Sequence, residues 1–159
     1  MKVLICSDTH RKHDNYLSVV EKEGPFDMMI HCGDTEGGEY LINESAGCPS
    51  EIVAGNNDFF GDLPRERTLL LGGKKVWITH GHNYYVSFET AFIVEEARSR
   101  GVDVVMYGHT HKPVVEDLGV LCINPGSLSY PRQAGRHPSY IILNIDEAGM
   151  WDLQIKYVD

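Results

Sequence analysis

The sequence lacks several features that would place it in common classes of protein. Its 159 residues include four cysteines, none in a Cys-x-x-Cys pair, so neither a zinc knuckle nor a redox motif is indicated. No apolar run approaches the roughly 20 residues of a membrane-spanning helix. The first apolar run, Val3–Cys6, turns polar at Ser7 and is too short for a secretory signal. We therefore expect a cytoplasmic protein with reduced thiols and no membrane partner.

An excess of basic charge is also missing. The chain has 14 Lys and Arg against 23 Asp and Glu, for a net charge of −9. Such a chain lacks the basic surface with which proteins bind long nucleic acids or anionic membranes. The length and the hydrophobic content of 42% are those of one globular domain, which we expect to span residues 1–159.

Short apolar runs alternate with turns over the first two thirds of the chain. The runs that we interpret as strands, covered on both faces, are Val3–Cys6, Met28–Ile30, Glu51–Ala54, Val76–Ile78 and Val102–Met106.

Two segments are typical of helices. One is expected over Asp14–Lys22, with Leu17 and Val20 on its apolar side. The other is expected from Ser87, as the N-cap, to Arg100, with Gly101 as the C-terminal glycine.

The last third is strand-like with little helix. Its predicted strands are Pro113–Glu116, Val120–Ile123, Ser139–Ile145 and Asp152–Val158. Turns at Leu118-Gly119 and Glu147–Gly149 suggest a β-meander. Together with the first part, this pattern predicts two stacked sheets with helices on their outer faces.

Polar side chains follow each strand-like run of the first two thirds. The segments are Asp8-Thr9-His10, Gly33-Asp34, Gly55-Asn56-Asn57-Asp58, Thr79-His80-Gly81-His82 and Gly108-His109-Thr110-His111. The run Thr68–Leu71 is the exception, because it ends in two glycines. Ligands of open α/β sheets bind at the carboxyl ends of the strands, so these side chains are expected to converge if the strands share a sheet.

Carboxylates, imidazoles and an amide oxygen suit Mn²⁺, Fe²⁺, Co²⁺, Ni²⁺ or Zn²⁺, and the absence of Cys ligands argues against a structural zinc site. Seven ligands are too many for one ion but fit two ions that share a carboxylate. Two adjacent cations can polarise a phosphoryl group and generate a hydroxide at neutral pH.

Simpler interpretations stay open for single residues. Taken alone, Gly-Asn-Asn-Asp is a turn signal, and Asp58 is expected to cap a turn or orient its neighbours. His31 fits a hydrogen-bonded core residue better than a ligand. Phe59-Phe60 and Tyr84-Tyr85 fit either a substrate wall or ordinary packing.

With these motifs in this order, the chain resembles the calcineurin-like metallophosphoesterases. The later Asn124-Pro125-Gly126-Ser127 and Pro131-Arg132 resemble the small YfcE-type phosphodiesterase branch, to which the retromer subunit Vps29 is also similar. The resemblance implies an α/β fold, a four-layer α/β/β/α sandwich of two mixed sheets with outer helices.

The resemblance also implies a site and a reaction. Asp8, His10 and His111 would hold one divalent metal ion, and Asn56, His80 and His109 a second, with Asp34 bridging the two. The reaction would be hydrolysis of a small phosphoester, most simply a phosphodiester, by a metal-bound hydroxide. Mn²⁺ is the first expectation, with Ni²⁺, Fe²⁺, Co²⁺ and Zn²⁺ as alternatives.

One position departs from the family pattern. Many members have a histidine where this chain has Asn57, and an amide has no proton to give at neutral pH. We therefore expect low-pKa leaving groups such as aryl alcohols to be favoured, and name His82 as the alternative proton donor. Ser127 or Arg132 is also considered as a phosphate contact.

Two other functions stay open. Asn57 would also suit a non-catalytic binding or scaffold module like Vps29, although the intact imidazoles count against it. A phosphomonoesterase would use the same mechanism with another substrate pocket. Homo-oligomer formation is left open.

Overall fold

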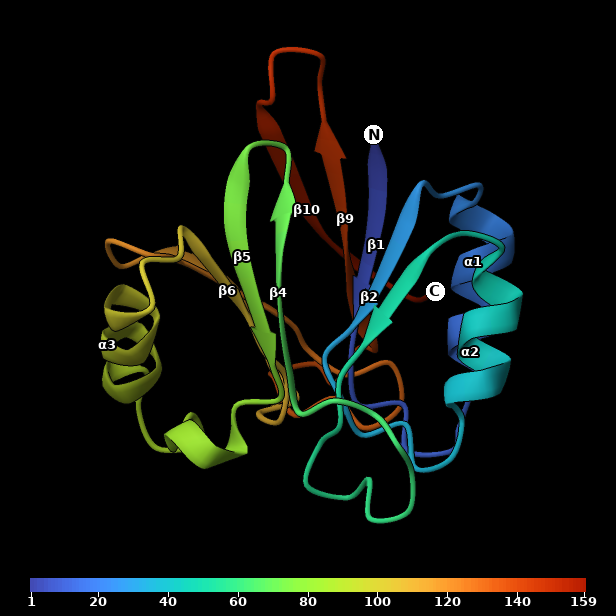
Figure 1. The fold of residues 1–159 in the computed structure, drawn as a ribbon. Coiled ribbons are helices and arrows are strands. Elements are labelled where there is room, and N and C mark those ends of the chain that lie inside the picture. Colours follow the sequence, from blue (N-terminus) through green and yellow to red (C-terminus); the bar gives the residue numbers. More distant parts are fainter.

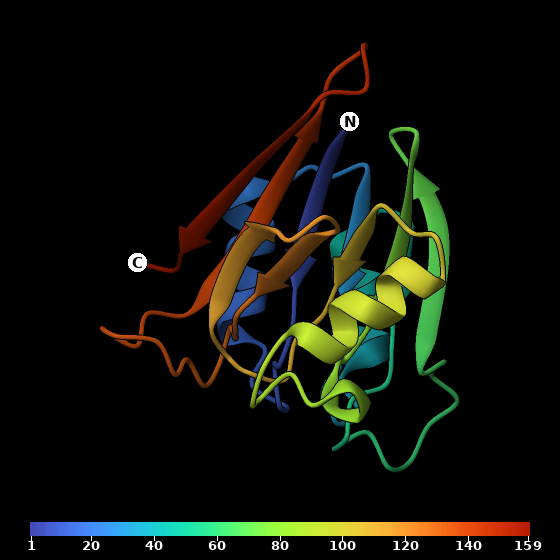
Figure 2. The ribbon, with the colours of Figure 1, turned by 90° about the vertical axis from the view of Figure 1, so that its left-hand side faces the viewer.

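The computed structural model describes all 159 residues as four stacked layers (Figure 1). Helices α1 (Asp14–Glu23) and α2 (Glu39–Ala46) cover the outer face of one five-stranded sheet. Helix α3 (Ala91–Ser99) covers the outer face of the other, as Figure 2 shows from that side. The predicted four-layer α/β/β/α sandwich of two mixed sheets is confirmed.

The first sheet has the strand order β10-β9-β1-β2-β3. Its strands are β1 (Lys2–Cys6), β2 (Met28–His31), β3 (Ser50–Ile52), β9 (Ser139–Ile145) and β10 (Trp151–Tyr157). Strands β1, β2 and β3 are parallel, while β9 runs antiparallel to both β1 and β10. The carboxyl ends of β1, β2 and β3 therefore lie at one edge.

The second sheet has the order β4-β5-β6-β8-β7. Its strands are β4 (Glu66–Leu71), β5 (Lys74–Thr79), β6 (Val104–Met106), β7 (Pro113–Asp117) and β8 (Leu121–Pro125). Strands β5, β6 and β8 are parallel, and β4 is antiparallel to β5. The turn after β4 therefore lies at the opposite end of the sheet from the loops after β5 and β6, which explains why that run carries no polar segment.

Alternation along the strands divides the core into layers. In β1, Val3 and Ile5 belong to a cluster of 14 buried residues between the two sheets, whereas Leu4 and Cys6 face the cluster under α1 and α2. A third cluster, around Trp77, lies under α3. Each buried aliphatic side chain contributes roughly 1.5–3 kcal/mol to folding, so the three layers of contact hold the sheets in register.

The buried face of α1 differs from the prediction. Tyr16 and Val19 are buried, while Leu17 is 39% exposed and Val20 is only partly buried. The Tyr16 hydroxyl donates to the carbonyl oxygen of Ile42 at 2.7 Å and so turns this face of α1 toward α2. The sequence analysis also missed α2 itself.

Helix α3 begins later than predicted. Its first residue is Ala91, because Phe88 N and Glu89 N both donate to Tyr85 O in a separate turn, where Ser87 does not act as an N-cap. A short 3₁₀ helix, η1 (His82–Tyr84), precedes that turn. At the other end, Gly101 has φ 62° and follows α3 as predicted for a C-terminal glycine.

The last four strands are not one meander. They form two hairpins in different sheets, β7–β8 and β9–β10, because the chain crosses from one sheet to the other after β8. The two predicted turns are present, at Leu118-Gly119 and within Asp146–Met150. All four cysteines are free, and Cys6 and Cys122 are buried as expected. The longest helix has ten residues, and none is long and apolar enough to cross a membrane.

Candidate metal centre

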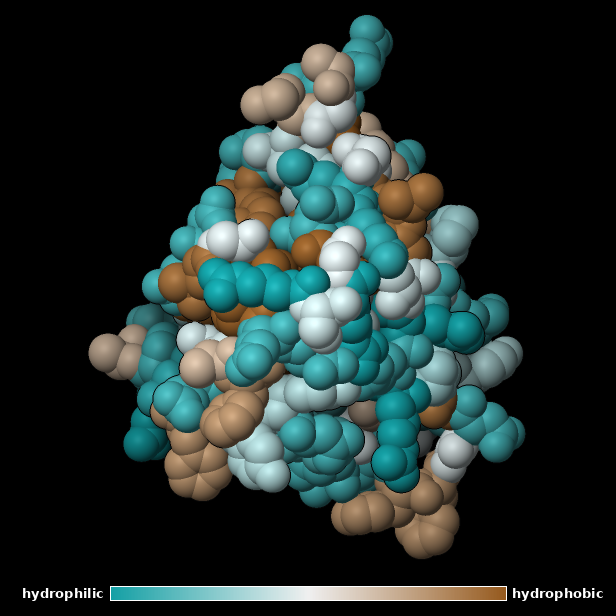
Figure 3. All heavy atoms as spheres, turned by 60° about the vertical axis from the view of Figure 1, so that its left-hand side comes forward, coloured by the Kyte–Doolittle hydropathy of each residue, from teal (hydrophilic) through white to brown (hydrophobic).

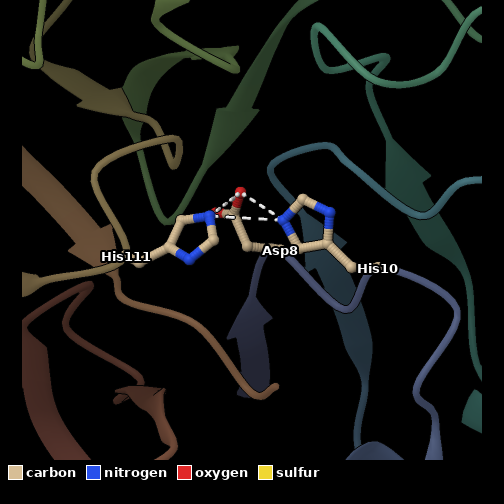
Figure 4. A group of neighbouring side chains, drawn as sticks. All are labelled: Asp8, His10 and His111. Atoms are coloured by element: carbon tan, nitrogen blue, oxygen red, sulfur yellow. Dashed lines mark hydrogen bonds and ion pairs between the residues drawn. The ribbon is translucent and has the colours of Figure 1, made fainter. Parts of the chain in front are cut away.

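The loops after β1 and β6 bring one group of candidate ligands together. Asp8 Oδ1 lies 3.1 Å from His111 Nε2 and 3.6 Å from His10 Nε2, and the two imidazole nitrogens are 3.2 Å apart. Figure 4 shows the two rings facing each other on either side of the Asp8 carboxylate. These three residues have the spacing of ligands around one ion.

A second group lies beside the first and shares Asp8 with it. His80 Nε2 is 3.4 Å from Asp34 Oδ2 and 3.8 Å from Asp8 Oδ1. Asp34 Oδ2 is also 3.7 Å from His10 Nε2, so this carboxylate lies between the two groups. Both groups are almost entirely buried, with His10 the most accessible member at an intermediate exposure.

Asn56 and His109 complete the set predicted from the sequence. Asn56 Oδ1 is 3.0 Å from His109 Nδ1, and the centroid of the His109 ring lies 5.2 Å from that of His80. The backbone N–H of His109 donates to Asp8 Oδ2. The fold thus brings all seven side chains to the carboxyl ends of β1, β2, β3, β5 and β6.

Two imidazoles are held with Nε2 turned into the cluster. His80 Nδ1 is 2.7 Å from the carbonyl oxygen of Cys32, and His111 Nδ1 is 2.6 Å from that of Tyr130. A carbonyl accepts only from N–H, so Nδ1 of each ring donates to the backbone and Nε2 is left to face the carboxylates.

This arrangement leaves buried polar atoms unpaired. Asp8 Oδ1 and His80 Nε2 are both buried without a hydrogen-bond partner. Both atoms lie in a buried site, where an unsatisfied polar atom costs roughly 1–3 kcal/mol. A divalent cation satisfies all of these atoms at once, so the residues present fit the metal ions that the sequence implies.

The pKa values report the same concentration of negative charge. Burial opposes protonation of His80, but the carboxylates of Asp8 and Asp34 outweigh it and raise the pKa of His80 to about 9. Burial likewise opposes ionisation of Asp34, whereas the contacts with His80 and Asn57 lower its pKa to about 2. The metal-free cluster thus holds a proton where a cation fits.

The ligand loops carry strained backbone. Five candidate ligands have positive φ despite having side chains: Asp8 (55°), His10 (44°), Asp34 (61°), His109 (68°) and His111 (57°). Such conformations cost on the order of 1–3 kcal/mol each and persist only where the surroundings impose them. Their concentration at one edge of the fold marks it as a functional site.

Asp58 fixes the loops instead of joining the cluster. Its carboxylate accepts hydrogen bonds from the backbone N–H groups of Asp34, Glu36 and Gly55 at 2.6–2.8 Å. This confirms the interpretation of Asp58 as a residue that orients its neighbours.

His31 is fully buried, and its ring nitrogens contact the Thr9 hydroxyl and the backbone N–H of Gly33, as expected of a core residue.

Asn57 holds the carboxylate between the two groups. Its backbone N–H donates to Asp34 Oδ1 and its side-chain amide donates to Asp34 Oδ2, both at 2.8 Å. The His82 ring lies 5.4 Å from His80 and 6.0 Å from His109 between centroids. Burial, followed by the charge of His80, lowers the pKa of His82, so its ring is neutral at pH 7.

The aromatic pairs and Ser127 have separate roles. Phe59 and Phe60 are 75% and 95% exposed, so they do not pack in the core, whereas the Tyr84 ring packs edge-on against Trp77. Ser127 is buried and donates to the backbone carbonyl of Asp8 at 2.8 Å, which makes it a support for the ligand loop.

Two depressions flank the cluster and meet at Glu36. The larger, about 740 Å³, is lined by His10, His111 and the segment Tyr130–Arg136, and the smaller, about 200 Å³, by Asn57, Phe59 and Phe60 among others. Tyr130 and Arg136 were missed in the sequence analysis, because no local motif marks that loop apart from Pro131-Arg132.

Comparison with known proteins decides the family. Residues 1–148 match the calcineurin-like phosphoesterase superfamily domain. The chain belongs to this family. It is 38% identical over 148 residues to a probable metallophosphoesterase of Bacillus subtilis, YsnB, covering 92% of this chain and 85% of that protein. It is 34% identical over 146 residues to a phosphodiesterase of Methanocaldococcus jannaschii, covering 79% of this chain and 83% of that protein.

Solved structures agree in fold. A predicted phosphoesterase from Streptococcus pneumoniae superposes with a TM-score of 0.82 at 27% identity, over 98% of this chain and 88% of that one. The Escherichia coli phosphoesterase YfcE gives 0.67 at 26% identity, over 92% and 89%. Entamoeba histolytica Vps29 complexed with Zn²⁺ gives 0.79 at 22% identity, over 99% of each chain. The resemblance to the YfcE-type branch and to Vps29 is confirmed, and the chain is a metallophosphoesterase of a metal-dependent hydrolase family.

Proposed function

We propose that this metallophosphoesterase is a phosphodiesterase that works with two divalent metal ions. The observation that carries the proposal is the pair of buried, unpartnered atoms, Asp8 Oδ1 and His80 Nε2. They belong to two ligand groups that share the Asp8 carboxylate. A buried cluster of this kind stabilises cations and has no structural use for its unpaired atoms.

We propose for each ligand the role that the family resemblance implies. Asp8, His10 and His111 would hold one ion, Asn56, His80 and His109 the other, and Asp34 would bridge them. Bound ions would polarise the phosphoryl group and lower the pKa of a water molecule at the site. Imidazole, carboxylate and amide donors suit Mn²⁺, which we propose as the preferred ion, with Ni²⁺, Fe²⁺, Co²⁺ and Zn²⁺ as alternatives.

The two depressions support a diester over a monoester. A phosphodiester has two organic arms on one phosphorus. The larger depression includes His10 and His111, and the smaller one lies beside Asn57, with Glu36 lining both. Phe59 and Phe60 rim the smaller depression and offer an apolar surface to one arm. A monoester would leave one of the two depressions unused.

We propose that Asn57 and His82 support the site without giving a proton to the leaving group. With both amide contacts on Asp34, Asn57 holds the bridging carboxylate in place. His82 is half-buried, and burial followed by the charge of His80 lowers its pKa, which disfavours the protonated ring that a general acid needs. An amide gives no proton either, and we therefore expect aryl esters to be hydrolysed much faster than alkyl esters.

The central experiment measures turnover of bis(p-nitrophenyl) phosphate and of p-nitrophenyl phosphate with Mn²⁺ and with EDTA. The expected result is Mn²⁺-dependent turnover with the diester favoured, and a loss of about 10³-fold in Asp34→Asn, because the bridging charge is removed. Elemental analysis should find two ions per chain. Turnover that does not depend on metal, or that survives Asp34→Asn, would contradict the proposal.

A leaving-group series tests the role of His82. Substitution His82→Gln should lower kcat/KM by about tenfold for methyl and p-nitrophenyl leaving groups alike, because a hydrogen bond is lost but no proton transfer. A defect that grows with the pKa of the leaving alcohol would instead make His82 the general acid.

The alternative of a non-catalytic module rests on fold similarity to Vps29 alone. Metal binding without turnover of any phosphoester in the central experiment would favour it.

We also propose a cytoplasmic location, supported by the four free cysteines, since exposure to an oxidising compartment favours disulfides.

A further inference from the structure

A groove leads away from the first ligand group along one wall of the molecule. It has a volume of about 740 Å³ and is lined by His10 and His111 of the first ligand group together with Tyr130, Arg132 and Arg136. A volume of this size accommodates a small-molecule arm. A group that extends from the candidate metal centre into this groove therefore shares it with two arginines.

These two arginines have no partner in the protein. Neither Arg132 nor Arg136 takes part in an ion pair, although acidic residues outnumber basic ones by 23 to 14. Glu36 is the one acidic residue that lines the groove, and its carboxylate lies 3.7 Å from His10 Nδ1 and 4.0 Å from Arg11 Nε. Two guanidinium groups are thus left available to an anion.

The wall of the groove is tied to the ligands. Arg132 N donates to the carbonyl oxygen of His111 at 3.0 Å, and His111 Nδ1 donates back to that of Tyr130. Tyr130 N in turn donates to Ser127 Oγ, which donates to the backbone of Asp8. The backbone that carries Arg132 is therefore held at a fixed place relative to the candidate metal centre.

A left-handed bend places the second arginine. Arg136 has φ 48° directly after Gly135 at φ 83°, and its N–H donates to Gln133 O at 3.0 Å. Gln133 Nε2 donates across the bend to the carbonyl oxygen of His137. The bend returns Arg136 to the same groove as Arg132.

We infer that this groove binds a second anionic group carried by one ester arm of the substrate. The inference rests on the proposed phosphodiesterase function and narrows its substrate class to asymmetric diesters with a phosphate, phosphonate or carboxylate on one arm. Guanidinium groups bind such anions through paired N–H donors. Arg132 and Arg136 select the substrate and take no part in bond breaking.

The kinetic test uses three p-nitrophenyl phosphodiesters whose second arm is a propyl chain ending in hydroxyl, carboxylate or phosphonate. Hydrolysis releases p-nitrophenolate from each, and the propyl arm stays on phosphorus. With Mn²⁺ and low salt, we expect kcat/KM for an anionic arm to exceed that for the hydroxyl arm by about tenfold. The carboxylate and phosphonate arms distinguish the two kinds of anion.

Substitutions assign the preference to the groove. The double variant Arg132→Gln, Arg136→Gln should reduce the anionic-to-neutral ratio to about one, whereas Arg98→Gln, which removes a cation on α3, should keep it. Turnover of all three esters without preference would overturn the inference and leave the proposed function standing. Absence of Mn²⁺-dependent turnover of any ester would overturn both.

Binding provides a readout that does not depend on catalysis. Calorimetric titration of the Mn²⁺-loaded protein compares 3-phosphonopropanoate with propylphosphonate, after subtraction of the heat of the ligand with Mn²⁺ alone. The carboxylate tail should tighten binding by about tenfold at low salt, less at high salt, and not at all in the double variant. Equal affinity of the two probes for the wild-type protein would overturn the inference.

Discussion

The space between the two sheets and the loops at the strand ends follow opposite rules. Between the sheets, 14 buried apolar residues from regular strands pack together. At the strand ends, buried carboxylates and imidazoles lie on backbone with positive φ and leave polar atoms unpaired. The first region stabilises the fold and the second weakens it. The apolar layer therefore holds the charged loops in a geometry that they would not adopt alone.

On the surface, too, hydrophobic and hydrophilic side chains lie in separate areas. Figure 3 shows a mostly hydrophilic face with hydrophobic side chains in separate patches, some of them projecting at its lower edge. Phe59, Phe60 and Phe88 are 75%, 95% and 87% exposed. All three lie in loops that follow strands β3 and β5, so exposed apolar surface is found near the candidate site.

The largest expected effect is a loss of free energy of unfolding caused by a substitution between the sheets. Ile141 is fully buried between the sheets, and Ile141→Ala should lower the free energy of unfolding by about 4 kcal/mol, because the cavity cannot close completely. Leu70→Ala, at a position that is 76% exposed, is the matched control and should change it by under about 0.5 kcal/mol. Urea unfolding measures both, and a similar loss in the two variants would contradict the comparison.

The pH dependence of stability in the metal-free protein tests a buried polar residue at the strand ends, His31. Burial lowers the pKa of His31 to about 4, below its value of about 6.5 in the unfolded chain. Because the folded pKa is the lower one, the contribution of His31 is complete above pH 6.5 and is lost as the pH falls toward 4. The loss is about 3 kcal/mol.

The control for His31 is a variant that does not titrate. In EDTA, urea midpoints measured between pH 7.5 and 4.5 should fall more steeply in the wild type than in His31→Gln. Parallel pH dependence in the two proteins would show that the folded protein does not favour neutral His31. The raised pKa of His80 has the opposite sign and is common to both proteins, so it cancels in the difference.

The part of the site that was predictable follows from one rule of topology. Parallel strands bring their carboxyl ends to one edge of a sheet, so Asp8 and Asp34, which follow β1 and β2, could be placed together although they are far apart in sequence. His80 follows β5 in the other sheet, and its place beside Asp34 depends on how the two sheets stack. The groove was not predictable in the same way. Arg132 is positioned by a backbone contact with His111, and no periodicity or motif encodes a contact between two loops.

The errors in the helices have a similar cause. The apolar pattern of α1 allowed Leu17 and Val20 on the buried side, and the Tyr16 contact with α2 selected a different face. Helix α2 buries only Ile42 and Ala46, which is too weak a pattern to predict a helix from sequence. Local sequence therefore gave the kinds of element, and tertiary contacts set their phase and bounds.

Metal binding at the strand ends should raise the free energy of unfolding of the whole protein. At an Mn²⁺ concentration 100 times its Kd, each ion that binds to the folded state alone adds about 2.7 kcal/mol to the free energy of unfolding. Ile141→Ala should gain the same increment from a lower starting value, because its cavity lies in the apolar layer. Urea unfolding with Mn²⁺ and with EDTA measures this, and an unequal increment would mean that the core substitution distorts the site.

The smallest change acts where a strand-end loop passes closest to a candidate ligand. A Cβ added at Gly55 would lie 2.0 Å from Asp34 Oδ1 and 2.6 Å from Asp34 N, whereas one added at Gly61, in the same loop, would meet nothing closer than Glu39 Oε1 at 3.6 Å. Neither glycine has positive φ, so backbone strain does not complicate the pair.

Gly55→Ala should therefore move the Asp34 carboxylate and lower Mn²⁺-dependent turnover by at least about tenfold, while Gly61→Ala stays within about twofold. The assay is the same bis(p-nitrophenyl) phosphate measurement, with circular dichroism to confirm that both variants fold. Equal activity in the two variants would mean that the position of Asp34 is not set by this contact. A selective loss in Gly55→Ala would show that a single methyl group at the strand ends affects chemistry more than stability, the reverse of what Ile141→Ala does between the sheets.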